Sequence, residues 1–278
     1  MARGGAAVTV RRPSCGKVWL VGAGPGAADL LTLRAARALA VADLVLYDAL
    51  VDESALALAP RAAKFSVGKR AGRASVAQDT IHTLLVRAAR SGKRVVRLKC
   101  GDPFVLGRGG EEALALAEAG VAVEVVPGVS SAIAGPGAAG IPVTLRGVSS
   151  GVLVLTAVPE ETCLKVLAAQ DPSAVTCVLL MALGGRARIA EHLLERGFRP
   201  DVPAAIVLGA TTARAWSWVG TLAELGRVTL PPDRDDLPGL VVLGDVVAAA
   251  APIRAALGVE PALTLHSHDR AEVHFGSA

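Results

Sequence analysis

The sequence predicts an α/β protein made of two α/β domains, and two observations carry this prediction. Short apolar runs, typical of buried strands, alternate with helical patterns through the first half of the chain. The alternation begins again after Gly147, so a domain boundary is expected there. Strands are predicted at residues 17–21, 44–47, 64–67, 95–98 and 121–126, and then at 152–156, 174–181, 204–208, 215–219 and 240–243.

Helices are predicted between these strands, and Asp29 and Ser75 are expected to cap two of them. The small-residue segment 132–140 is expected to be broken at Pro136. Trp216 and Trp218 alternate with smaller residues, a stripe more typical of core than of a cofactor site. The predicted helices cover residues 30–40, 53–59, 75–90, a stretch that begins at 111, and residues 160–169, 186–196 and 245–257.

The chain is expected to divide into four parts. The tail carries scattered histidines in a short polar terminus, which is usually disordered. We therefore expect an N-terminal extension at residues 1–16, an N-terminal α/β domain at 17–147, a C-terminal α/β domain at 148–257 and a disordered tail at 258–278.

Composition excludes several classes of function. Aromatic residues make up only 3% of the 278 residues, which argues against stacking platforms for nucleic acid. No apolar run reaches the roughly 18 residues that a membrane span needs. The 4 cysteines lack the close pairing of a zinc site or a disulfide framework, so a reducing cytoplasm is expected. The net charge of +4 could favour an anionic substrate, but from charge alone a solvated arginine-rich surface is the preferred explanation.

Residues 94–112 form the stretch around which the chain is organised. An apolar strand runs into a loop of small residues, and a helix begins after the loop. Asp102 precedes Pro103, which biases it to an extended conformation at the strand's carboxyl end. Open α/β sheets bind ligands at that edge. An ordinary glycine-rich connection is the alternative interpretation.

Two further loops carry candidate chemistry. Gly22, Gly24 and Ala27, with Asp48 about twenty positions on, are similar to a dinucleotide fingerprint and favour an oxidoreductase hypothesis. Pro25 counts against it, because it removes an N–H donor where a pyrophosphate would bind. The basic loop 68–73 could receive carboxylates or simply coat a surface.

Six motifs follow one another along the chain, at residues 18–26, 46–51, 67–70, 100–104, 107–112 and 125–132. Each motif is weak alone, but six in one order are specific. Together they closely resemble the tetrapyrrole methylase family, and within it the enzymes that methylate uroporphyrinogen III. The resemblance runs from about residue 17 to residue 250 and is strongest in the first half.

The resemblance implies two α/β domains with S-adenosylmethionine in the cleft between them, in a homodimer. It implies methylation of uroporphyrinogen III at C2 and C7, giving precorrin-2 through precorrin-1 for sirohaem or cobalamin, with no metal. The small-molecule tetrapyrrole is then the partner, rather than nucleic acid or a membrane. Since about sixteen residues precede the first strand, the dehydrogenase and chelatase of fused sirohaem synthases are expected to be absent.

The resemblance also assigns roles residue by residue. Asp48 is implied as proton acceptor and Lys69 as proton donor. Because arginine suits bidentate carboxylate binding, Arg70, Arg73, Arg108 and Arg146 are candidate partners of the substrate's carboxylates. The implied cofactor contacts are Pro25, Cys100, Gly101, Asp102, Val105, Ser130, Ser131, Met181 and Ala210.

The chain departs from the family pattern at several positions. Cys100 replaces a glycine, and a cysteine would be strained at a strongly positive φ. Ala157 and Leu145 also replace usual family residues. Two alternatives therefore stay open beside the oxidoreductase: a paralogue acting on a later corrin intermediate, and a tetrapyrrole-binding member with reduced catalysis.

Overall fold

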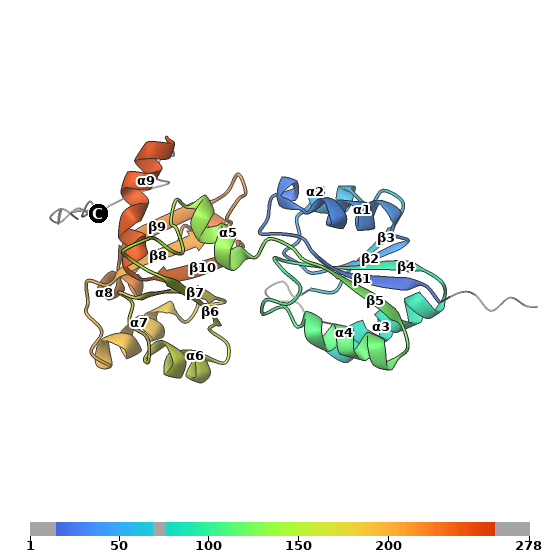
Figure 1. The fold of residues 1–278 in the computed structure, drawn as a ribbon, viewed down its shortest axis with the longest axis horizontal. Coiled ribbons are helices and arrows are strands. Elements are labelled where there is room, and N and C mark those ends of the chain that lie inside the picture. Colours follow the sequence, from blue (N-terminus) through green and yellow to red (C-terminus); the bar gives the residue numbers. More distant parts are fainter. Residues whose placement is uncertain (1–14, 69–75, 259–278) are drawn as a thin grey trace, which may run out of the picture. The chain divides into compact units, whose positions relative to one another are not determined.

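The computed structural model describes residues 15–68 and 76–258, and it confirms the α/β class. The chain divides into two compact units, Met1–Ser131 and Ala132–Ala278, each with one five-stranded sheet (Figure 1). Within the described ranges, no helix combines the length and apolar character needed to cross a membrane.

The sheet of the first unit is parallel throughout and has the strand order β3-β2-β4-β1-β5. Because all its strands run the same way, their carboxyl ends meet at one edge, where the loops that follow them gather. The strands are β1 (Lys17–Gly22), β2 (Leu44–Tyr47), β3 (Ala63–Ser66), β4 (Arg94–Lys99) and β5 (Ala122–Val126).

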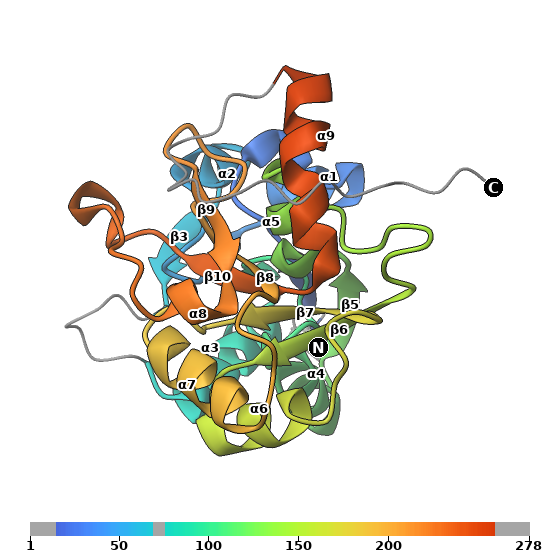
Figure 2. The same cartoon turned by 90° about the vertical axis from the view of Figure 1, so that its left-hand side faces the viewer.

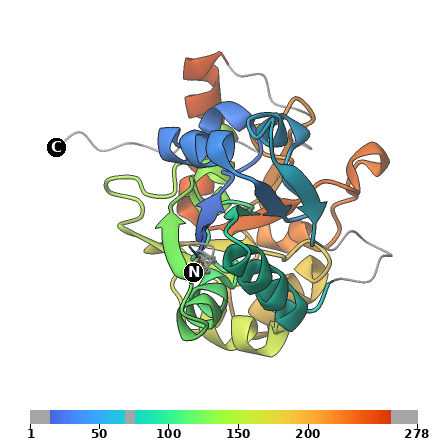
Figure 3. The same ribbon diagram turned by 90° about the vertical axis from the view of Figure 1, so that its right-hand side faces the viewer.

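Helices cover both faces of this sheet (Figures 1 and 3). Successive residues of β4 point to opposite faces, so Val96 packs with the helices of one face and Val95 with those of the other. The first face carries α1 (Leu33–Val41) and α2 (Glu53–Ala57), and the second carries α3 (Gln78–Arg90) and α4 (Gly109–Glu118).

The predicted cap of the first helix is wrong. Asp29 lies in the short 3-10 helix η1 (Ala28–Leu30), and Thr32 caps α1 by accepting the N–H of Ala35 at 3.2 Å. Ser75, predicted to cap the helix that ends at Arg90, lies outside the described residues.

The sheet of the second unit is mixed, with the order β6-β7-β10-β8-β9. Only β6 and β7 are parallel, while β10 is antiparallel to β7 and β8, and β9 is antiparallel to β8. A short loop without a helix joins β8 to β9, which permits antiparallel pairing. The strands are β6 (Gly151–Thr156), β7 (Val175–Leu180), β8 (Pro203–Leu208), β9 (Trp216–Thr221) and β10 (Gly239–Leu243).

Helices again lie on both faces (Figures 1 and 2). Trp216 and Trp218 pack into the core on one face of this sheet, as predicted from their alternation. One face carries α5 (Ser131–Ala138), η3 (Asp245–Ala249) and α9 (Ala250–Leu257), and the other carries α6 (Glu160–Leu167), α7 (Arg186–Glu195) and α8 (Leu222–Leu225), with η2 (Pro232–Arg234) in a connection.

The segment around Pro136 differs from its prediction. Residues 132–138 stay helical through Pro136, so the predicted break is wrong. Close packing on the second sheet accounts for this, since a Cβ on Gly135 would lie 2.6 Å from Leu240 Cδ2. Ala132 and Ile141 belong to the same core, so the two units divide after Ser131, earlier than the predicted boundary at Gly147.

Candidate active site

Three loops meet at the carboxyl edge of the first sheet, after β1, β4 and β5. Gly24 and Gly101 join two of them through a reciprocal pair of backbone hydrogen bonds. The Gly24 N–H donates to Gly101 O at 3.2 Å, and the Gly101 N–H donates to Gly24 O at 2.8 Å. Gly101 has φ +62°, a conformation that glycine adopts at little cost.

Gly22 and Gly128 allow the loops to approach one another closely. A Cβ on Gly22 would lie 2.5 Å from Gly101 O and 2.6 Å from Gly128 Cα. The absence of a side chain at Gly22 therefore serves contact between loops within the protein. This gives the first glycine of the dinucleotide-like pattern a structural explanation that needs no bound nucleotide.

Asp102 clamps the loop after β4 to the loop after β5. Its Oδ1 accepts the N–H of Phe104 at 2.8 Å, and its Oδ2 accepts the N–H of Gly128 at 3.0 Å. The N–H of Val105 donates to Asp102 O at 3.3 Å, which closes the turn. The predicted extended position of Asp102 at the strand end thus places both oxygens on backbone donors.

The other cofactor candidates of this unit border the same loops. A Cβ on Gly101 would lie 3.5 Å from Ser131 N and 3.8 Å from Ser130 Cα. Pro25 directly follows Gly24. Cys100 has an ordinary φ, because the positive φ falls on Gly101, so replacing the family's glycine brings no backbone strain here. Burial, with a further contribution from the Asp48 carboxylate, raises the pKa of Cys100 to about 12.

A buried cluster of charges lies beneath this edge. Arg97 and Lys99 stand two residues apart on β4 and both reach Glu112 of α4. Arg97 Nε donates to Glu112 Oε1 at 3.0 Å, and Lys99 Nζ donates to the same oxygen at 3.1 Å. Arg97 Nη2 also donates to Asp48 Oδ1 at 2.5 Å. This cluster was not predicted from the sequence, although two cations alternating inside an apolar strand would have been the signal.

The two carboxylates affect the pKa of Arg97 more strongly than its burial does. Burial by itself lowers the pKa of Arg97, but Asp48 and Glu112 together raise it above its ordinary value. Burial, and after it the charge of Arg97, lowers the pKa of Lys99. The cluster holds two cations and two anions, so its formal charges balance.

Asp48 is the partly exposed member of the cluster. It directly follows β2, and its N–H donates to Leu98 O at 3.1 Å, which fixes it beside the end of β4. Its side chain is 29% exposed, against 3% for Arg97. Tyr47, Ala49 and Lys64 help to line an adjoining cavity of about 560 Å³. A carboxylate held in this way can accept a proton from a molecule at the surface.

The structure describes only some of the predicted basic residues. Lys69, Arg70 and Arg73 lie outside the described residues. Arg108 is exposed at the start of α4 with φ +58°, and its guanidinium donates to Glu111 at 2.9 and 2.7 Å. Arg146 belongs to the second unit, where it is exposed in the turn that Leu145 and Ser149 close.

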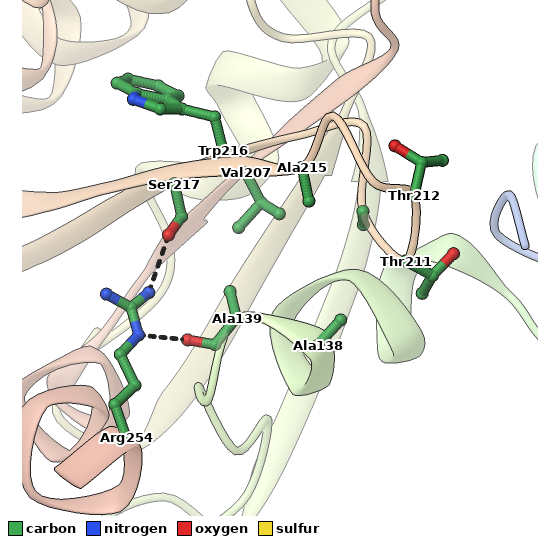
Figure 4. Close-up of a pocket in the computed structure, with 10 residues that line it drawn as sticks. Ala138, Ala139, Val207, Thr211, Thr212, Ala215, Trp216, Ser217 and Arg254 are labelled. Atoms are coloured by element: carbon green, nitrogen blue, oxygen red, sulfur yellow. Dashed lines mark hydrogen bonds between the residues drawn. The ribbon is translucent and has the colours of Figure 1, made fainter. Parts of the chain in front are cut away.

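Two cofactor candidates also belong to the second unit. Met181 follows β7 with φ +59° and is 54% exposed. Ala210 follows β8 and lines a cavity of about 360 Å³ (Figure 4). Alanine and valine side chains form much of its wall, with Thr211, Thr212 and Ser217 adding hydroxyls.

Arg254 of α9 reaches the wall of this cavity. Its Nε donates to Ala139 O at 2.6 Å and its Nη2 to Ser217 Oγ at 2.9 Å (Figure 4). Within residues 15–68 and 76–258 it forms no salt bridge with a carboxylate, and burial lowers its pKa. Gly140 leaves room for it, because a Cβ there would lie 2.7 Å from Arg254 Cγ. Arg254 therefore ties α9 to the end of α5.

Residues 17–226 match the family described as tetrapyrrole (corrin/porphyrin) methylases. The uroporphyrinogen-III C-methyltransferase of Pseudomonas aeruginosa is 43% identical over 235 residues, which cover 83% of this chain and 94% of that protein. The siroheme synthase of Edwardsiella ictaluri is 42% identical over 233 residues, but these span only 50% of its length and 84% of this chain.

A solved structure agrees with the sequence relatives. The uroporphyrin-III C-methyl transferase of Thermus thermophilus, in complex with S-adenosyl homocysteine, is 45% identical and superimposes with a TM-score of 0.71. The match covers 84% of this chain and 99% of that one.

Proposed function

Because the chain belongs to the tetrapyrrole methylase family, we propose that it transfers methyl groups from S-adenosylmethionine to uroporphyrinogen III. The observation that carries this proposal is the identity of 43% over nearly the whole Pseudomonas aeruginosa methyltransferase. The loop cradle of Gly22, Gly101 and Asp102 supports it from the structural side.

The residues of the cradle fit such a cofactor. Glycines let backbone groups approach a ligand closely, and Asp102 places a negative charge beside the position of a cationic molecule. Ser131 adds a hydroxyl next to Gly101, and the backbone of Ser130 lies beside it. When bound, S-adenosylmethionine supplies an electrophilic methyl group on a sulfonium. Cofactor contacts are proposed at Pro25, Cys100, Gly101, Asp102, Val105, Ser130, Ser131, Met181 and Ala210.

Asp48 and Lys69 are proposed to move protons. Methylation of a ring carbon leaves positive charge on the macrocycle, and loss of a proton discharges it. Asp48 is a partly exposed carboxylate at the sheet edge, so it suits the role of proton acceptor. Lys69 is proposed as proton donor. The protein's main contribution is to position methyl donor and acceptor.

The substrate's carboxylates call for cationic partners. Arg70, Arg73, Arg108 and Arg146 are proposed for this role, because arginine binds carboxylates bidentately. Arg108 already pairs with Glu111 through two hydrogen bonds, so binding by Arg108 requires exchange of that partner.

The finer reaction is proposed from the family as well. Methylation at C2 and C7 would give precorrin-1 and then precorrin-2, for sirohaem or cobalamin biosynthesis. A homodimer in the cytoplasm is proposed with it, and light scattering of the purified protein tests the dimer.

The first experiment is a methyl-transfer assay on the purified full chain. We would incubate it without oxygen with S-adenosylmethionine and enzymatically generated uroporphyrinogen III, and record product mass and the spectrum after oxidation. Two added methyl groups on uroporphyrinogen III are expected. NMR of product carrying a labelled methyl group would then locate the modified carbons.

Other results would point to the alternatives. No transfer with tight binding of S-adenosylhomocysteine would indicate a changed substrate, and later corrin intermediates would then be assayed. Binding of tetrapyrrole without any turnover would indicate the catalytically reduced member. Preference for NAD(H) over S-adenosylhomocysteine would revive the oxidoreductase.

A further inference from the structure

We propose that Arg97 is the positioning residue for Asp48, and that Glu112 and Lys99 hold Arg97 in place for this task. The inference rests on the proposed function, because it assigns a support to the proposed proton acceptor. It adds three buried residues to the site, and none of them is among the proposed cofactor or substrate contacts.

Arg97 is held by acceptors from three different parts of the unit. Nε donates to Glu112 of α4 at 3.0 Å, Nη1 donates to Leu98 O of β4 at 3.2 Å, and Nη2 donates to Asp48 Oδ1 at 2.5 Å. A planar guanidinium with every nitrogen engaged has little freedom to turn. The position of Asp48 Oδ1 is therefore set by a side chain that is itself buried.

The two side-chain oxygens of Asp48 differ in their hydrogen bonding. Oδ1 accepts from Arg97, whereas Oδ2 has no hydrogen-bond partner within residues 15–68 and 76–258. Arg97 thus holds one oxygen, and among the described residues the other is left to accept a proton. This is the arrangement that a positioned general base requires.

Glu112 acts as the anchor of the cluster. Its side chain is fully buried, and Oε1 alone accepts from Arg97, Lys99 and Gln78, the last at 3.1 Å. Lys99 provides the second positive charge, so Glu112 stays paired while Arg97 is shared with Asp48.

Stability alone is a weak reason for this cluster. Removing charges from water costs about as much as their attraction returns, and apolar residues of similar size often stabilise a core equally well. The neighbouring positions Val95 and Val96 of the same strand are buried apolar residues of that kind. What an apolar replacement could not supply is a rigid donor directed at Asp48.

The test is a cycle of variants in the methyl-transfer assay, measured as single turnovers with radiolabelled S-adenosylmethionine. Arg97→Lys keeps the charge but loses the planar fork. We expect its rate to fall about tenfold to a hundredfold, with the Kd for S-adenosylhomocysteine unchanged. Asp48→Asn alone is expected to lose about 10² to 10⁴ in rate.

The double variant decides the matter. If Arg97 acts through Asp48, adding Arg97→Lys to Asp48→Asn lowers the rate no further. Substitutions of residues that act as a unit do not have additive effects on the activation free energy. A purely structural role predicts that the two losses multiply, and that result would overturn the inference. Arg94→Lys is the matched control: Arg94 lies on the same strand and pairs with Asp43 at an exposed site, so the rate should not change.

Two further outcomes separate this inference from the proposed function. Should Arg97→Lys fail to fold, the isosteric Glu112→Gln enters the same cycle, and its loss must also vanish in the Asp48→Asn background. If wild type transfers methyl groups and Asp48→Asn is equally active, Asp48 is not the proton acceptor and Arg97 does not position one. The proposed reaction would stand in that case. Absence of transfer by wild type to uroporphyrinogen III and to every later corrin intermediate assayed would refute the proposed function and the inference together.

Discussion

The carboxylate of Asp102 accepts the backbone N–H of Gly128 at 3.0 Å, and this bond joins the ends of β4 and β5. The two residues lie 26 positions apart in the sequence. Asp102 also accepts the N–H of Phe104, so one side chain fixes the shape of its own loop and the distance to the next one. The loops that border the proposed cofactor position are thereby held as one body.

Asp102→Asn is expected to weaken binding of S-adenosylhomocysteine. The amide nitrogen would face an N–H donor at Phe104 or Gly128, and leaving such a group unpaired costs about 1–3 kcal/mol. Isothermal titration calorimetry should show a Kd raised by roughly tenfold or more. Asp171→Asn is the control, because Asp171 accepts the N–H of Ser173 at 2.9 Å in an exposed turn of the second unit. Equal affinity in wild type and Asp102→Asn would contradict the clamp.

Gly22→Ala is expected to destabilise the first unit. The new methyl group would lie 2.5 Å from Gly101 O, so the loops must separate, and overpacking of this kind typically costs about 1–3 kcal/mol. Urea denaturation measures the loss. Gly110→Ala is the matched control, since a Cβ there meets nothing within 4 Å and the residue is helical. That control should have the same free energy of unfolding as wild type or one up to about 1 kcal/mol higher. Equal losses of stability in both variants would contradict the close approach of the loops at Gly22.

The cysteines are expected to differ sharply in reactivity. Burial raises the pKa of Cys100 to about 12 and that of Cys177 to about 11, and burial also raises the pKa of Cys163. Since the thiolate is the nucleophile, these three should resist iodoacetamide at pH 8, whereas exposed Cys15 should react. Peptide mass spectrometry identifies the modified sites, and labelling in denaturant should reach all four. Rapid modification of Cys100 in the native protein would show that its environment is more open.

The pair of Asp43 and Arg94 should give a small stabilisation that disappears in acid. The hydrogen bond from the Arg94 side chain lowers the pKa of Asp43 from 3.8 to about 2. Because the pKa is lower in the folded state, the stabilisation is complete above about pH 4 and is lost as the pH falls towards 2. Comparing wild type with Asp43→Asn by urea unfolding at pH 6 and pH 3 should show a gap that narrows at pH 3. The gap is expected to be modest, since both side chains are exposed.

Local sequence signals predicted most of the elements near the site. The run that ends in Lys99 is apolar enough to identify β4 as a strand, and Pro103 indicates where the loop turns. The tryptophan alternation identified β9 and its buried face. Such signals suffice because strand formation and turn formation depend on neighbours a few residues apart.

Other features could not be predicted in that way. Asp29 has the residue type of a cap, but Thr32 stands at the position that the helix leaves for one. Pro136 has the residue type of a helix breaker, but packing of Gly135 against Leu240 outweighs it. In both units, the order of strands in the sheet departs from their order in the chain.

The sequence by itself determined the α/β class, the glycine loops after the strands and, through its motifs, the family. Only the tertiary structure decided that Asp48, Arg97 and Glu112 form one cluster. Asp48 and Arg97 are 49 residues apart, and they meet because β2 and β4 are neighbours in the sheet. Residue type records which groups can pair, but strand order sets which of them do, since that order depends on how the whole unit buries its apolar faces.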